Sequence, residues 1–107
     1  MEHDHGGHRG RLKARFLKEG LDNFAEHEIL ELLLFFSIPQ RNTNDIAHEL
    51  INKFGSLQGV LEADPDALTE VNYVKENSAV LIKLVAAIAR RCAIASNGDE
   101  VYFNTVE

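Results

Sequence analysis

The fold is decided by residues 54–91, which read FGSLQGVLEADPDALTEVNYVKENSAVLIKLVAAIARR. Apolar residues recur there at helical spacing, which predicts two short amphipathic helices followed by one long apolar helix. The inward faces of the two short helices are formed by Leu57, Val60, Leu61, Leu68 and Val71. A tight connection at residues 72–75, NYVK, separates the second short helix from the long one. We therefore expect an all-α fold with a sharp corner near residue 73.

The boundaries of the two short helices have recognisable capping residues. Gly55 is suited to the left-handed position after a helix, and the Ser56 hydroxyl can accept from the amides of the next one. Asp64 and Pro65 repeat this device, with Asp64 as N-cap and Pro65 at the first helical position. These signals predict breaks at residues 55–56 and 63–64.

Outward from this stretch, the chain predicts three further helices on its N-terminal side. The first runs from His8 to Glu19, ends at Gly20, and has an apolar stripe of Leu12, Phe16 and Leu17. The second follows residues 23–26, NFAE, which resemble a capping box. It is apolar nearly all round over residues 29–36, so we expect it to be the buried central helix, ending at Ser37-Ile38-Pro39. The third covers residues 42–54 and is capped by Asn42.

The long helix is expected from Glu76 to Ala95, broken by residues 96–99, SNGD. The chain has 107 residues, which is the length of one domain with one modest core. We predict a compact bundle of five or six short helices over residues 8–95. Residues 1–7 are expected to be disordered, and residues 96–107 to be a linker or the start of a missing C-terminal domain.

Composition excludes several classes of protein. No apolar run reaches the ~20 residues of a membrane span, and no apolar signal peptide opens the chain. The single cysteine, Cys92, allows no internal disulfide, which fits a reducing cytoplasm, and we expect it to be a buried structural thiol. The chain is therefore expected to be cytoplasmic, with no membrane partner.

The net charge of −6 is unevenly distributed. Residues 8–18 contain five basic and no acidic residues, whereas residues 19–70 contain eleven acidic and two basic ones. Any nucleic-acid contact should therefore use the first helix and the corner after Val71. The alternative is that the basic helix simply pairs with the acidic body.

No catalytic site is evident, and we expect no cofactor. His3, Asp4, His5 and His8 have metal-binding side chains but no rigid spacing, so no metal site is expected. The carboxylates of Glu26, Glu28 and Glu31 are expected on an exposed helix face, with no nucleophile or base set against them. The chain is therefore not expected to be an enzyme.

The FGSL opening, the PDAL helix and the Ala-rich last helix resemble helix-hairpin-helix modules of DNA-processing proteins, of the SAM/RuvA-C-terminal-like kind. That resemblance implies two glycines at the hairpin, which let a phosphate approach the amides opening the next helix. Tyr73 and Lys75 stand in those two positions. It further implies phosphate contacts from Lys75 and from the amides near Asn77 and Ser78.

Residues 8–92 are similar to the N-terminal domain of RadC-family proteins. The resemblance rests on HRGRL at 8–12, HEILELLL at 27–34, FGSL at 54–57, LIKL at 81–84 and ARR at 89–91. The family is named for DNA repair. It implies a helix-hairpin-helix domain joined, in a longer protein, to a C-terminal JAMM/MPN-type metal-dependent domain that is absent from this sequence.

Two functions compete on this sequence. The first is a non-catalytic module that binds DNA phosphates without sequence preference, with contacts from Arg9, Arg11, Lys13, Arg15, Lys75, Asn77 and Ser78. The second is an interdomain or protein-binding scaffold that has lost DNA binding, with Tyr73 as the contact to its partner. The missing hairpin glycines favour the second, and the family resemblance favours the first.

Overall fold

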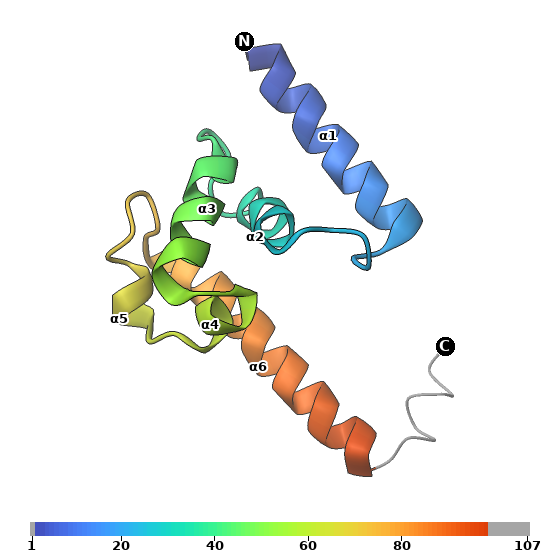
Figure 1. Cartoon of the computed structure of the whole chain (residues 1–107), viewed down its shortest axis with the longest axis vertical. Coiled ribbons are helices and arrows are strands. Elements are labelled where there is room, and N and C mark those ends of the chain that lie inside the picture. Colours follow the sequence, from blue (N-terminus) through green and yellow to red (C-terminus); the bar gives the residue numbers. More distant parts are fainter. Residues whose placement is uncertain (1, 99–107) are drawn as a thin grey trace.

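The computed structural model describes residues 2–98, with side chains described for residues 7–95. This part of the chain is helical and contains no strand, so the predicted all-α class is confirmed. The helices are α1 (Glu2–Glu19), α2 (Glu26–Leu34), α3 (Thr43–Phe54), α4 (Leu57–Glu62), α5 (Pro65–Leu68) and α6 (Glu76–Gly98). Figure 1 shows α2 to α5 gathered around the first half of α6, while α1 and the second half of α6 extend outward.

The apolar side chains form two separate clusters. The larger joins α2, α3, α4, α5 and α6, and its fully buried members are Leu30, Leu34, Ala47, Leu50, Val60, Leu68, Val74 and Ile82. The smaller fixes α1 to α2 and consists of Leu12, Phe24, Leu32 and Phe35, with Ile29 packed against it. The first half of α6 therefore belongs to the main core, and α1 is fixed by the smaller one.

The predicted helix boundaries around α3 and α4 are confirmed. The Asn42 side chain accepts from the Asn44 amide at 3.0 Å, and Gly55 ends α3 in the left-handed region with φ 92°. The Ser56 hydroxyl accepts from the Gly59 amide at 3.0 Å. Asp64 and Pro65 open α5 as expected, but the Asp64 side chain makes no capping hydrogen bond.

The start of α2 differs from the prediction. The helix begins at Glu26 with Ala25 as N-cap, so the capping box is not formed by residues 23–26. Alanine has no side-chain acceptor, and only the reciprocal half of the box is made, by the Glu28 carboxylate accepting from the Ala25 amide at 2.9 Å. The helix ends at Leu34 and continues as a turn, which leaves Phe36 68% exposed.

Both long helices are longer than predicted. α1 begins at Glu2, so residues 2–7 are helical where disorder was expected, and α6 continues through Ser96 and Asn97 to Gly98. Residues 99–107, expected as a linker or the start of a missing domain, lie outside the described residues. None of the helices in the described range is both long and apolar enough to cross a membrane.

Two side chains are placed opposite to their predicted environments. Glu31 is 3% exposed rather than solvated, because its carboxylate is bonded to His8 Nε2 at 2.7 Å and accepts from Asn44 Nδ2 at 3.2 Å. Cys92 is exposed rather than buried, because α6 has by then passed the end of the core. The expected structural thiol is therefore wrong.

Candidate nucleic-acid interface

The corner between α5 and α6 is a tight turn in which Tyr73 takes a left-handed backbone. Its φ is 70°, a value that glycine adopts far more readily than an aromatic residue. The turn is closed by the Val74 amide, which donates to the Val71 carbonyl at 3.1 Å, and Val74 is fully buried. Lys75, the second expected glycine position, has no positive φ. Only one of the two positions therefore has the backbone conformation that favours glycine.

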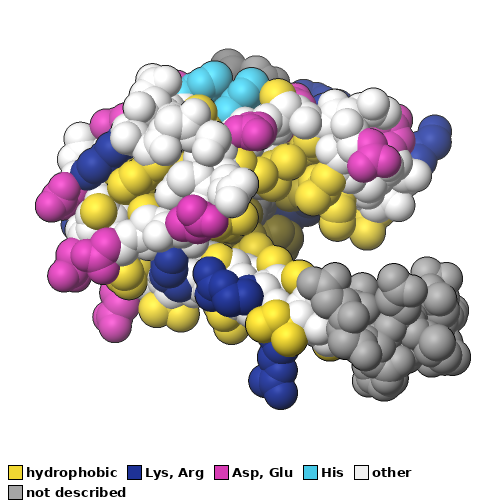
Figure 2. All heavy atoms as spheres, turned by 60° about the horizontal axis from the view of Figure 1, so that its bottom comes forward, with side chains coloured by type: hydrophobic (Ala, Val, Ile, Leu, Met, Phe, Trp, Pro, Cys, Tyr) yellow, Lys and Arg dark blue, Asp and Glu magenta, His cyan; other side chains and the backbone are white. Residues whose placement is uncertain are grey.

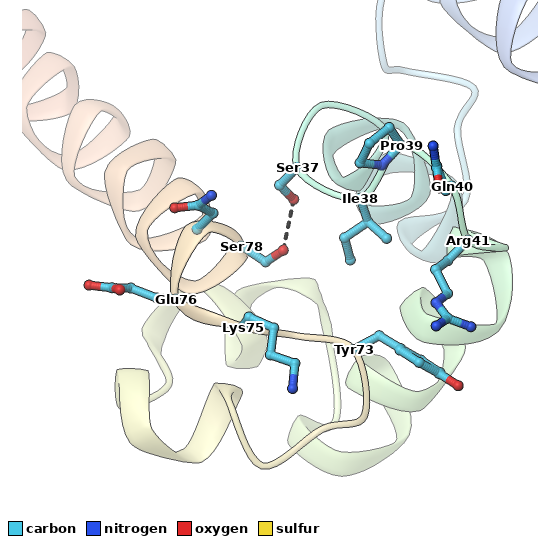
Figure 3. A pocket seen from close by; sticks show the side chains of 10 residues that line it. Ser37, Ile38, Pro39, Gln40, Arg41, Tyr73, Lys75, Glu76 and Ser78 are labelled. Carbon is cyan, nitrogen blue, oxygen red and sulfur yellow. Dashed lines mark hydrogen bonds between the residues drawn. The ribbon is translucent and has the colours of Figure 1, made fainter.

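An open cavity of about 570 Å³ lies beside this turn. One wall is formed by the α2–α3 loop and the other by the turn and the first residues of α6 (Figure 3). Its charged lining side chains are Arg41, Lys75 and Glu76. Two cations and one carboxylate give the cavity a net positive lining.

The first three residues of α6, Glu76, Asn77 and Ser78, also line this cavity. The first hydrogen bond of the helix runs from the Ala79 amide to the Lys75 carbonyl at 3.0 Å. Within the described residues, the amides of Glu76, Asn77 and Ser78 have no hydrogen-bond partner, as is usual for the first turn of a helix. The N-terminus of a helix carries a partial positive charge, so these groups favour an anion.

Tyr73 does not close the cavity. Its ring is 47% exposed and stacks against the Arg41 guanidinium, whose central carbon lies 4.0 Å from the ring centroid. Figure 3 shows both side chains at the edge of the cavity, on the side away from Glu76. The contact holds Arg41 beside the turn, so the cation is positioned by the residue that replaces a glycine.

Ser78 is buried and does not offer its side chain to a ligand. It is 2% exposed, and its hydroxyl shares a 2.8 Å hydrogen bond with the Ser37 hydroxyl (Figure 3). This bond joins the α2–α3 loop to α6 and fixes the two walls of the cavity. Of the two predicted residues here, Asn77 is exposed, and Ser78 has only its amide to contribute.

Two of the four predicted basic residues of α1 make hydrogen bonds to other parts of the same chain. The Arg9 guanidinium donates to the carbonyls of Ile38 at 2.9 Å and Arg41 at 2.8 Å, and it stacks on Phe35 at 4.5 Å. Arg9 therefore fixes the α2–α3 loop against α1.

Arg15 is engaged in a similar way at the other end of α1. It donates to the Asn23 carbonyl at 2.7 Å, pairs with the Glu28 carboxylate at 3.2 Å, and stacks on Phe24 at 4.2 Å. The expected alternative, in which the basic helix pairs with the acidic body, describes Arg15, whereas Arg9 bonds backbone carbonyls instead of carboxylates.

Arg11 and Lys13 are exposed. The Lys13 ammonium lies 5.3 Å from the centroid of the Phe36 ring, and Phe36 is adjacent in sequence to Ser37, which lines the cavity. Lys13 is thus placed toward the same side of the molecule as the α2–α3 loop. Nothing in the sequence pattern separates Lys13 from Arg9 and Arg15, because all three are basic residues of one amphipathic helix.

Arg41 is the cavity residue that the sequence reasoning missed. It follows Ile38-Pro39 in a polar loop and is 32 residues from Tyr73, so no helical or strand spacing links the two. The sequence feature that could have identified Arg41 is its isolation in an acidic stretch, since residues 19–70 contain only one other basic residue, Lys53.

Two carboxylates outside the cavity have shifted pKa values. The pKa of Glu28 is lowered because its carboxylate accepts from the Ala25 amide and, secondly, from Arg15. The pKa of Glu70 is lowered by its hydrogen bond to Lys53, whose ammonium lies 2.8 Å away. Both shifts accompany contacts that fix helices, so neither identifies a reactive group.

Over 87 residues the chain is 45% identical to a UPF0758 protein of Fusobacterium nucleatum, and UPF0758 is the RadC family. The resemblance to RadC-family proteins is confirmed. The matched region is 81% of this chain but only 38% of that relative, so the chain spans well under half the length of the RadC-family protein it matches. No family model matches the chain, and no solved structure matches it.

Proposed function

We propose that this chain is a non-catalytic module of a RadC-like protein that binds nucleic-acid phosphates without sequence preference, at the cavity beside Tyr73. The observation that carries the proposal is that one cavity is lined by Arg41, Lys75 and the first three residues of α6, whose backbone amides have no partner within the described residues. Under this proposal, α5, the turn and α6 act as a degenerate helix-hairpin-helix. Phosphate oxygens would accept from the amides of the first turn of α6.

The left-handed Tyr73 supports this reading. A helix-hairpin-helix needs a backbone with positive φ at its corner, and the turn has it at φ 70° although the glycine is missing. The side chain that replaces the glycine lies against Arg41 rather than over the amides. The replacement therefore leaves the anion site accessible and adds a positioned guanidinium to its edge.

The expected affinity is weak. The Glu76 carboxylate lines the cavity and opposes an anion, and the body of the protein is acidic. Phosphate contacts without base recognition give dissociation constants of about 10⁻⁴–10⁻⁶ M at physiological salt. Lys13 and Arg11 can add contacts to a longer nucleic-acid strand. Arg9 and Arg15 are not proposed as phosphate contacts, because their guanidinium groups already bond to the same chain.

Fluorescence anisotropy with a labelled oligonucleotide tests the proposal. The full chain should bind with micromolar affinity at 50 mM salt and lose roughly one to two orders of magnitude by 200 mM, as expected for a few phosphate contacts. Lys75→Glu and Arg41→Ala should each weaken binding about five- to tenfold, and Glu76→Gln should strengthen it. Lys18→Glu, an identical charge change on an exposed residue of α1, is the matched control for Lys75→Glu.

Absence of binding at tens of micromolar would contradict the proposal, as would binding that does not depend on salt. Equal losses of affinity from Lys75→Glu and Lys18→Glu would show that only the net charge matters. The cavity would then have no specific part in binding.

An interdomain or protein-binding scaffold is the second candidate. It is supported by Glu76 at the cavity and by the 47% exposed Tyr73 ring at a corner where aromatic residues are good partner contacts. Its test is the double variant Tyr73→Gly with Lys75→Gly. A gain of DNA affinity in that variant would show that the natural turn has lost a phosphate contact, whereas a loss favours the first candidate.

A further inference from the structure

The outer face of α6 carries a row of exposed apolar side chains. Val80, Leu84 and Ile88 are 57%, 52% and 54% exposed, and their four-residue spacing places them on one side of the helix. Figure 2 shows hydrophobic side chains along α6 where it extends from the rest of the molecule. We call Val80, Leu84 and Ile88 the α6 ridge.

The second half of α6 has no support from the described part of the chain. Ala86 is its last buried residue, and every residue from 87 to 95 is exposed. This segment reads AIARRCAIA, so it exposes alanine and isoleucine over more than two turns. An isolated helical segment of this length is marginal in water, and packing of an apolar face normally supplies its stability.

Grooves flank the first half of the ridge on both sides. One, of about 600 Å³, lies between α5 and α6 and shares Val80 and Leu84 with the ridge. The other, of about 500 Å³, lies between α6 and the exposed Phe36 and shares the same two side chains. A ridge between two grooves is the surface that a second helix needs for side chains to interdigitate.

The ridge is complementary to itself when a second α6 runs antiparallel with Leu84 at the two-fold axis. Position i then faces position 168 − i, so Val80 of one copy meets Ile88 of the other, and Leu84 meets Leu84. The same register places Arg91 opposite Asn77, one residue from Glu76. Each end of the pairing therefore brings a cation beside a carboxylate, and the antiparallel helix dipoles are also favourable.

From this self-complementarity we propose that the α6 ridge binds a second copy of this chain, forming a two-fold symmetric antiparallel helix pair. The pairing covers the apolar residues of the second half of α6 that the described part of the chain leaves exposed. It also brings Arg91 of the second copy toward Glu76 at the phosphate cavity. At 1.5 Å per residue, the two cavities lie roughly 20 Å apart along the helix pair.

Sedimentation equilibrium of the full chain between 10 and 500 µM measures the association. The expected mass rises with concentration toward twice 12.0 kDa. Leu84→Glu places two carboxylates at the axis and should weaken the dimer more than a hundredfold. Because residue 84 is exposed, circular dichroism should keep the helical signal of the core and lose at most the contribution of the second half of α6. Leu17→Glu, the same change at an 82% exposed leucine of α1, is the matched control and should leave the dimer intact.

Charge reversal tests the register independently. Glu76→Arg and Arg91→Glu should each weaken the dimer severalfold, and the double variant should restore much of the loss. Glu49→Arg, at an exposed carboxylate of α3, controls for net charge.

A mass of 12.0 kDa at all concentrations overturns the proposal, and so does a dimer that survives Leu84→Glu. A single reversal that strengthens the dimer overturns the antiparallel register. Nucleic-acid binding has its own readout, so the monomeric Leu84→Glu variant separates failure of the dimer from failure of the phosphate site.

Discussion

α1 and the corner at residues 72–78 were both expected to contact phosphate. The polar groups of α1 are largely bonded within the chain, whereas those of the corner are left without partners in the described part of the chain. In α1, Arg9 and Arg15 donate their hydrogen bonds to carbonyls and a carboxylate of the same chain. At the corner, the Lys75 side chain and three backbone amides have no partner within the described residues. A count of basic residues therefore overstates the number of cations that α1 leaves without an internal partner, and it overlooks the unpaired amides of the corner.

The difference has a simple origin. Arg9 faces the end of α2, where the carbonyls of the last turn and of the following loop lack helical partners and attract a guanidinium. The corner presents the beginning of a helix, where amides are unpaired and repel a cation. The same incomplete bonding at helix ends thus withdraws one set of polar groups from solvent and exposes the other.

The largest effect that sharpens this comparison is expected from Arg9→Ala. It removes two short charge-assisted hydrogen bonds and a stacking contact, which should lower the free energy of unfolding by about 2–3 kcal/mol. Arg11→Ala, an exposed neighbour on the same helix, should change it by less than about 0.5 kcal/mol. Urea unfolding followed by circular dichroism measures both. Similar small losses in the two variants would show that Arg9 is not structural.

A smaller effect is expected at Tyr73. Valine tolerates a φ of 70° poorly, so Tyr73→Val should cost about 1–2 kcal/mol of stability. Tyr73→Gly relieves the backbone but loses the Arg41 contact and gains unfolded-state entropy, so it should stay within about 1 kcal/mol of the natural protein. Thermal unfolding of the two variants separates them. Equal stability of the valine and glycine variants would mean that the left-handed turn is not maintained in solution.

The smallest effect concerns Glu28 and its partner Arg15. Because the folded-state pKa of Glu28 lies below its ordinary value of 4.5, the folded protein favours the carboxylate. Its contribution to stability is fully present above about pH 4.5 and is lost as the pH falls through the lowered pKa. Glu28→Gln keeps an acceptor for the Ala25 amide and removes the charge.

The glutamine variant should therefore be slightly less stable than the natural protein at pH 7, and the difference should shrink toward zero by pH 3. Urea unfolding at four or five pH values measures it. A difference that is the same at pH 7 and pH 3 would show that the charge of Glu28, bonded to the Ala25 amide and to Arg15, contributes nothing to stability. Glu62→Gln, on α4, serves as the control carboxylate, since its hydrogen-bond partner is the neutral side-chain amide of Gln58.

The sequence predicted the helical class and the helix boundaries around α3 and α4 because both depend on local chemistry. Asn42, Gly55 and Ser56 each act within three or four residues of their own position, so their roles follow from residue type. The same holds for the apolar spacing of α3 and α4. The corner at residue 73 was also located, because apolar helical patterns end on both sides of it.

The remaining errors come from tertiary contacts. Glu31 is buried only because His8 of α1 and Asn44 of α3 both reach it, and no spacing in the sequence relates the three. Cys92 is exposed because α6 is longer than the core it packs on, which composition does not reveal. At the candidate site, Lys75 and the amides of α6 were predicted, while Arg41 depends on a loop that returns to Tyr73 from 32 residues away.

The division of the core into two clusters determines which part of the molecule unfolds locally. α1 is held by Leu12 of the small cluster and by the hydrogen bonds of its polar side chains, and none of its described side chains belongs to the large cluster, so α1 can detach as a unit while α2 to α6 stay closed. Backbone amides of α1 should then exchange with solvent deuterium sooner than those of α3. The corner belongs to the large cluster through Val74, so its shape survives each such opening.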